Sequence, residues 1–136
     1  MPNTKKLSFS EAVERLQFHS GSHPDVDDPR WAAGFLQTLQ PYRGFLDREA
    51  WDDVLHCVDA VEEHLRSAPK IDRRVINSLW GICHFARAWA IHPDGMLPRN
   101  RLITTTDSEK LATWIDDLSD RVAMLLDTPE GSRTDE

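Results

Sequence analysis

Apolar residues recur at helical spacing in five segments of the chain, separated by stretches rich in Gly, Pro and polar residues. Each segment opens on Ser, Thr or Asp, which are residue types that cap helix N-termini. None alternates apolar and polar residues over the length of a strand. The predicted helices cover residues 8–18, 28–40, 47–68, 72–91 and 106–127. The pattern therefore predicts an all-α, single-domain bundle of five helices.

Two predicted helix starts carry the capping-box spacing, in which a hydroxyl residue is followed three positions later by Glu. Ser8 with Glu11 marks the first helix, and Thr106 with Glu109 marks the last. The segment between the last two helices holds several breakers, so we expect residues 92–105 to be irregular.

Helix 72–91 has the widest apolar face. At 100° per residue, with Asn77 at zero, apolar side chains fill an arc from about 80° to about 300°. An arc of this width is typical of a helix surrounded by others. We therefore expect this helix at the centre of the bundle, with Trp80 and Trp89 largely buried.

A chain of 136 residues with 40% hydrophobic and 29% charged residues is sufficient for one domain with a real core. We assign residues 8–127 to that domain, 1–7 to a flexible N-terminus and 128–136 to a disordered acidic tail. The sequence shows no apolar run near twenty residues and no secretory leader, so we expect a cytoplasmic protein without a membrane span.

Cys57 and Cys83 both fall inside helical patterns, which suits reduced core thiols better than a disulfide. Metal ligation is not favoured, because Asp53 to His56 is the only acid-x-x-His spacing and His19 and His23 only flank a loop. We expect neither a metal nor another cofactor.

The chain is strongly acidic. It has 16 Lys and Arg against 23 Asp and Glu, which gives a net charge of -7. This balance argues against direct nucleic-acid binding, which depends on neutralising phosphates. Acidic residues crowd the outer sides of the third and fifth predicted helices: Asp52, Asp59, Glu62, Glu63, Asp116, Asp117 and Asp120. They form either a solvated face or a docking surface for a basic protein partner.

Aromatic and apolar residues in the loops would supply close contacts to such a partner, or would simply pack onto the bundle. Tyr42 and Phe45 lie in the turn before the third helix, and Met96 and Leu97 lie in the segment before the last. In size, charge and fold class the chain resembles the small acidic helical immunity proteins of bacteria, although no family motif carries this likeness. The resemblance implies a non-catalytic antitoxin-like protein that blocks a basic toxin, for example a nuclease.

The narrow polar face of helix 72–91 carries Asn77, His84 and Arg87. These side chains form either a structural polar seam paired with Asp116 or Asp120, or an anion-binding site. The first alternative predicts that removing Arg87 destabilises the fold.

Arg87 and His92 have the spacing R-x4-H, which resembles the R-x4-6-H motif of HEPN ribonucleases, a family of small all-helical proteins. The resemblance implies a metal-independent ribonuclease in which Arg87 stabilises charge on the phosphate and His92 transfers a proton. Ala88 stands where that family often has a polar residue. An interaction protein remains the first hypothesis, and this ribonuclease is the alternative.

Overall fold

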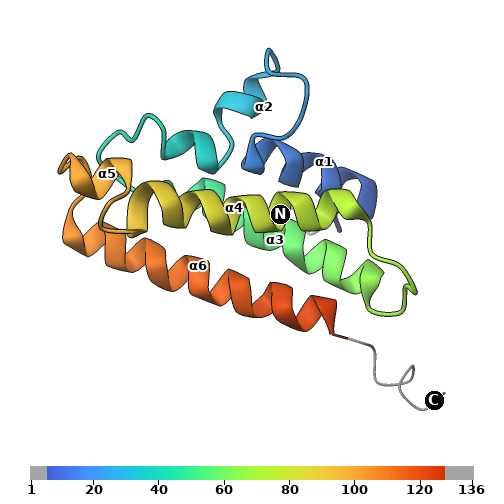
Figure 1. Ribbon diagram of the computed structural model, residues 1–136. Coiled ribbons are helices and arrows are strands. Elements are labelled where there is room, and N and C mark those ends of the chain that lie inside the picture. Colours follow the sequence, from blue (N-terminus) through green and yellow to red (C-terminus); the bar gives the residue numbers. More distant parts are fainter. Residues whose placement is uncertain (1–5, 128–136) are drawn as a thin grey trace.

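The computed structural model describes residues 6–127, which are mostly helical and contain no β-strand (Figure 1). The predicted all-α class is confirmed. Most of the predicted N-terminal segment (residues 1–5) and the predicted tail (residues 128–136) lie outside the described residues. The elements in order are α1 Phe9–Ser20, α2 Pro29–Ala32, the 3₁₀ turn η1 Leu36–Thr38, α3 Arg48–Leu65, α4 Arg73–Ala86, the π-helical turn η2 Arg87–Ile91, α5 Met96–Arg99 and α6 Thr105–Leu126.

The four longer helices, α1, α3, α4 and α6, enclose one hydrophobic core. Helix α1 packs against α3 and α4, and α4 packs against α1 and α6. Side chains join α6 to α3: the rings of Trp51 and Trp114 stack with centroids 5.4 Å apart, and Phe35 packs against both. Each of the four helices contributes fully buried apolar residues, so every long helix keeps one face inside and one outside.

Helix α4 is one of these four helices, and its predicted central position is not confirmed. Its buried residues are Val75, Ser78, Leu79, Ile82, Cys83 and Ala86. The predicted burial of Trp80 is wrong, because this residue is 62% exposed, and Trp89 is only partly buried. The reason is geometric. Trp80 and Phe85 lie at the two edges of the apolar arc, beyond the part that α1 and α6 cover.

The second predicted helix is divided into α2 and η1. A Cβ added at Gly34 would lie 2.2 Å from the Phe18 carbonyl oxygen, so only glycine lets the chain pass this close to the end of α1. His19 Nδ1 accepts the Phe35 backbone N–H at 3.0 Å. Contacts with α1 therefore replace the hydrogen bonds that a continuous helix would make here.

The predicted caps Ser8, Asp28 and Asp47 are confirmed, since each side chain accepts a backbone N–H in the first turn of its helix. The predicted cap Thr106 is wrong. Thr104 Oγ1 accepts the Asp107 N–H at 3.1 Å, and α6 begins two residues earlier. Both threonines have an acidic residue three positions later, so the sequence spacing alone did not separate them.

The end of α4 widens into the π-helical turn η2, where the His92 N–H donates to the Arg87 carbonyl oxygen at 2.8 Å. The chain then turns back so closely that a Cβ added at Gly95 would lie 2.4 Å from the Ala88 carbonyl oxygen. The short helix α5 follows, within a segment that was predicted to be irregular. Its Leu97 is buried in the core, so this predicted partner contact is a packing residue.

Candidate functional site

A continuous row of aromatic rings lies on the outer face of α4 and η2. Trp80 stacks on His84 at 6.2 Å, His84 meets the edge of Phe85 at 4.9 Å, and Phe85 packs against Trp89 at 5.3 Å. Trp80 is 62% exposed and Phe85 is 42% exposed, and His84 between them in the row is also exposed. We call these four residues the aromatic strip. Large aromatic rings at the surface are typical of interaction sites.

The helix around the strip carries small side chains and no acidic ones. Gly81 and Ala88 lie between the rings at 100° per residue, which leaves the surface shallow there. From residue 73 to residue 92 the chain contains three arginines and no Asp or Glu. The strip is therefore an apolar face without acidic side chains on a strongly acidic protein.

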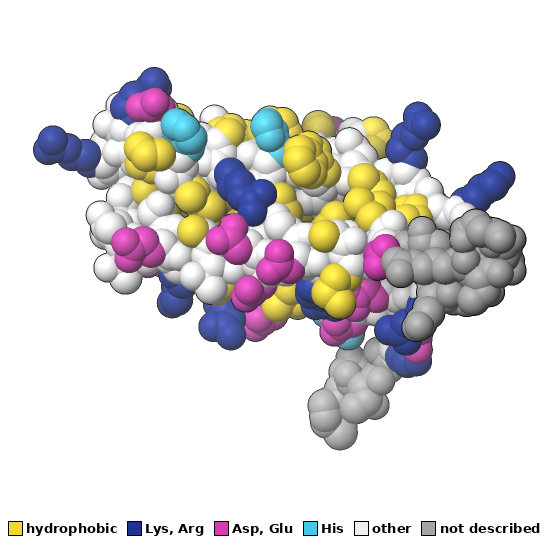
Figure 2. All heavy atoms as spheres, turned by 60° about the horizontal axis from the view of Figure 1, so that its bottom comes forward, with side chains coloured by type: hydrophobic (Ala, Val, Ile, Leu, Met, Phe, Trp, Pro, Cys, Tyr) yellow, Lys and Arg dark blue, Asp and Glu magenta, His cyan; other side chains and the backbone are white. Residues whose placement is uncertain are grey.

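Acidic residues of α6 border the strip on one side. Asp116 accepts a hydrogen bond from Arg87, and so lies at the edge next to α4. At 100° per residue Asp120 comes next around α6, and Asp117 lies on the side nearer α3. All three are exposed. Figure 2 shows this face, with hydrophobic and histidine side chains above a row of acidic ones. We call Asp116, Asp117 and Asp120 the α6 acidic row.

The acidic residues predicted on α3 are exposed or half-buried, but each has an internal cationic partner. Arg121 of α6 binds both Asp59 and Glu62, with an Nη2–oxygen distance of 2.7 Å to each. In the same way Asp52 pairs with Arg48 and Glu63 with Lys6. The hydrogen bonds that Arg121 donates to Glu62 are the main reason that the pKa of Arg121 is raised. Much of the α3 charge is therefore balanced inside the molecule.

The two aromatic residues predicted to contact a partner have different positions. Tyr42 is half-buried, and its hydroxyl donates to Asp107 Oδ2 at 2.7 Å, tying the segment before α3 to the start of α6. Burial and this bond raise its pKa above the ordinary tyrosine value. Phe45 is 58% exposed and lines a surface hollow. Tyr42 thus has a structural contact, and Phe45 is the more exposed of the two.

The predicted polar seam is divided. Arg87 Nη2 donates to Asp116 Oδ1 and to Ser119 Oγ, both at 2.9 Å, which joins α4 to α6 as the structural alternative predicts. Asn77 and His84 are exposed, and His84 contacts rings rather than a carboxylate. The pair that forms lies near the surface, with Asp116 exposed and Arg87 half-buried.

Arg87 and His92 lie one π-helical turn apart, at the start and the C-terminal cap of η2. The Arg87 guanidinium already binds the Asp116 carboxylate, which would compete with a phosphate for the same positive charge. The His92 ring is exposed, and its Nδ1 accepts the Asp94 backbone N–H at 3.1 Å.

A partly buried polar network between α1 and α3 was not predicted. His19 Nε2 lies 2.8 Å from Asp53 Oδ2, and Arg15 Nη1 donates to Asp53 Oδ1 at 2.9 Å. Since His19 Nδ1 accepts the Phe35 N–H, Nε2 carries the ring proton and donates it to Asp53. The His19 bond, helped by Arg15, holds the pKa of Asp53 below its usual range. The i, i+4 spacing of Arg15 and His19 was the available signal.

The cysteines and histidines form no metal centre within residues 6–127, where no group of three or more His, Cys, Asp or Glu side chains is placed to hold an ion. Cys57 and Cys83 are free and buried. Burial raises the pKa of both thiols, which makes them poor nucleophiles. No helix in the described part of the chain is long and apolar enough to cross a bilayer.

Comparisons with protein-family models, with curated proteins and with solved structures find no match for this chain. The aromatic strip and the acidic residues beside it are therefore the features that bear on function.

Proposed function

We propose that this protein is a non-catalytic interaction protein that binds another protein through the aromatic strip. The observation that carries the proposal is the exposure of Trp80 and Phe85, joined through His84, on a helix whose opposite face is fully packed. Aromatic rings contribute most of the binding energy in many protein interfaces, because they bury a large area at low entropic cost.

The charge next to the strip indicates the kind of partner. The α6 acidic row lies along one edge, and within residues 6–127 neither Asp117 nor Asp120 has a cationic partner in an ion pair. A partner that places apolar residues on the strip and Lys or Arg over the row would have complementary charge, which speeds association and fixes orientation.

The finer form of the proposal is an immunity or antitoxin-like protein that neutralises a basic toxin in the cytoplasm. Its support is the acidic balance of the chain, the α6 acidic row and the two buried free thiols. The ribonuclease alternative has less support, because Arg87 is engaged by Asp116 and Ser119. Incubation of the purified protein with RNA separates the two, since an interaction protein leaves the RNA intact.

The test is capture of partners from the native cell by the tagged full-length chain, followed by binding kinetics with the partner recovered. The double variant Trp80→Ala with Phe85→Ala should weaken binding by about 30-fold or more. This is the loss expected when two anchors that together contribute about 2 kcal/mol or more are removed. Met124→Ala is the matched control, because Met124 is an exposed hydrophobic residue of α6 outside the strip. A partner that binds the Trp80 and Phe85 variant with full affinity would overturn the proposal.

Charge reversal tests the orientation of the partner. Asp116→Lys with Asp120→Lys should slow association more than it speeds dissociation, and added salt should weaken the wild-type complex. Asp52→Lys with Asp59→Lys should have a smaller effect, because these carboxylates are paired internally and lie on α3. If neither salt nor reversal of the α6 acidic row changes the association rate, the partner does not use this charge.

A further inference from the structure

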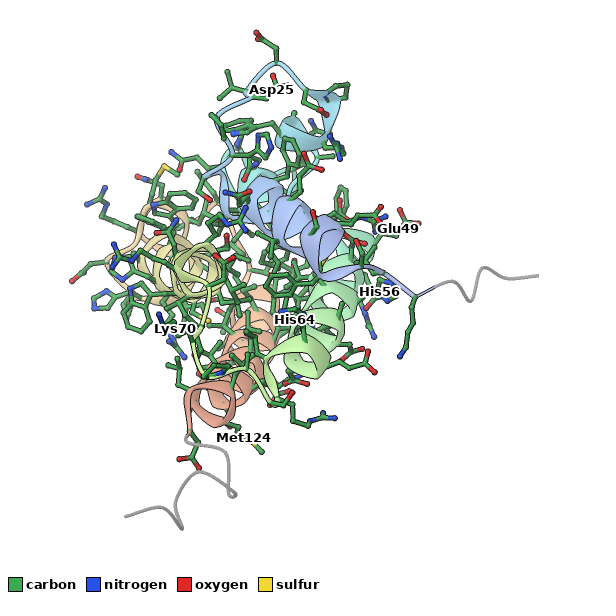
Figure 3. The ribbon with its side chains drawn as sticks, turned by 90° about the vertical axis from the view of Figure 1, so that its right-hand side faces the viewer. Asp25, Glu49, His56, His64, Lys70 and Met124 are labelled. Atoms are coloured by element: carbon green, nitrogen blue, oxygen red, sulfur yellow. The ribbon has the colours of Figure 1, made fainter. Side chains whose placement is uncertain are left out.

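A surface groove lies on α1, α3 and the α2 segment, away from the aromatic strip. It consists of two hollows, of about 320 Å³ and about 410 Å³, and both are lined by Ala33 and Asp47. In Figure 3, Glu49 marks the groove at the junction of α1 and α3. No residue of the aromatic strip lines either hollow. The groove is therefore separate from the site of the proposed function.

The two hollows differ in chemistry. The first has an apolar wall of Pro29, Ala32 and Phe45, against which an apolar side chain fits. Its other lining residues are Ala33, Gln37, Thr38, Arg43 and Asp47. Phe45, which is 58% exposed, has no internal role that would explain its position. Ala33 between the hollows is small, which allows the backbone of a bound chain to approach closely.

The second hollow is acidic. Its lining includes the carboxylates of Glu11, Asp47, Glu49 and Asp53 and the guanidiniums of Arg15 and Arg30. Arg30 is balanced by Asp28, which lies outside the lining, at 2.9 Å. Arg15 pairs with Asp53 and Glu11, so its single positive charge offsets only part of the negative charge of the four lining carboxylates. Glu49 is exposed and has no ion pair among residues 6–127. An excess of negative charge therefore remains at the mouth of this hollow.

The floor of the second hollow is rigid. Asp53 is held by His19 and Arg15, and Asp47 is fixed as the N-cap of α3 by the Ala50 N–H at 3.0 Å. A cation that enters meets carboxylates already held in position, so little side-chain entropy is lost on binding. A guanidinium or ammonium group on a flexible stem is the ligand that fits this arrangement.

We infer that the groove binds an extended segment of a partner protein that carries an apolar side chain close to an Arg or Lys. The apolar side chain would occupy the hollow beside Phe45, and the basic group would lie over the fixed Asp47 carboxylate, which lines both hollows, and pair with Glu49. The charge complementarity of the second hollow and the adjoining apolar hollow together select this occupant. The inference is independent of the aromatic strip.

The test is an NMR titration of the ¹⁵N-labelled full chain with capped glycine peptides. These carry one apolar residue (Val, Leu, Met or Phe) and one Arg, separated by zero, one or two glycines. We expect amide shifts at Ala33, Phe45 and Ala50 for at least one peptide, and a loss of affinity of about tenfold or more when its Arg is replaced by Gln. Glu49→Lys should weaken binding by a similar factor, and Phe45→Ser should weaken it about fivefold.

Glu109→Lys is the control, since Glu109 is exposed on α6 outside the groove. Equal binding of the Arg and Gln peptides would overturn the inference, as would shifts confined to other surfaces or no shift with any peptide at millimolar concentration. Equal affinity for free arginine would also overturn it, because the site would then hold only a small cation. These results leave the test of the aromatic strip unaffected, because no strip residue lines the groove.

Discussion

Leu79 and Trp80 are neighbours on α4 with opposite environments, since Leu79 is fully buried and Trp80 is largely exposed. Leu79→Ala should therefore lower the free energy of unfolding by about 2–5 kcal/mol, through lost burial and the cavity left behind. Trp80→Ala should change it by no more than about 0.5 kcal/mol. Urea unfolding of the two variants measures both values. A loss at Trp80 as large as that at Leu79 would show that the ring has a structural role.

Asp53 gives the fold a defined pH dependence. Its pKa is lower in the folded protein than in the unfolded chain, chiefly through the His19 bond. The resulting stabilisation is present above the unfolded pKa, about 4, and is lost as the pH falls through the folded pKa. Asp53→Asn should be less stable at neutral pH, and its stability should fall less on acidification below pH 4.

The control is a carboxylate that has no such partner among residues 6–127. Asp117 meets this condition and is exposed on α6. The Asp117→Asn variant should therefore show the same fall of stability with acidification as the wild type. Chemical unfolding at several pH values provides the measurement. Parallel acid profiles for the wild type and Asp53→Asn would contradict the role assigned to this network.

At the scale of elements, the start of α6 depends on one hydroxyl. Thr104→Ala should cost about 1 kcal/mol, because the Asp107 N–H loses its acceptor. Thr106→Ala should cost little, since Thr106 lies inside the helix and is exposed. Thermal unfolding of the two variants distinguishes the caps, and equal losses would place the helix start elsewhere.

The sequence pattern predicted the long helices well, because each buries a stripe of apolar residues and begins at a capping side chain. It failed for residues 28–40, where the close approach of Gly34 to α1 and the His19 bond to Phe35 override local preference. These contacts join residues far apart in the chain, and helical periodicity contains no information about them.

The aromatic strip was missed for a related reason. Trp80 and Phe85 fall within the apolar arc of α4, and an arc shows which residues are apolar without showing how many neighbouring helices cover them. The acidic residues of α3 and α6 were predicted to be at the surface, and the structure places them there. Their pairing with Arg48, Arg121 and Lys6 depends on tertiary structure, which spacing alone does not give.

For the whole molecule, the negative charge makes internal cations important. Arg121 of α6 binds Asp59 and Glu62 of α3 and is largely shielded from solvent. Arg121→Met should lower the free energy of unfolding by about 1–2 kcal/mol. Added salt should recover part of this loss by screening the repulsion left between the carboxylates.

Arg48→Met is the matched control, because the Arg48–Asp52 pair is exposed and lies within one helix. It should change stability by less than about 0.5 kcal/mol. Urea unfolding at low and high salt measures both variants. A loss at Arg121 that salt does not reduce would mean that its aliphatic stem, rather than its charge, joins the two helices.

The tight turn at Gly95 also limits how the sequence can evolve. A side chain there would collide with the Ala88, Trp89 and His92 carbonyl oxygens, which are main-chain atoms that cannot move aside independently. Descendants of this sequence that keep the π-helical turn should therefore retain glycine eight positions after Arg87, while the exposed rings of the aromatic strip are free to diverge as binding partners change. Selection at Gly95 acts on backbone shape, and selection at Trp80 acts on recognition.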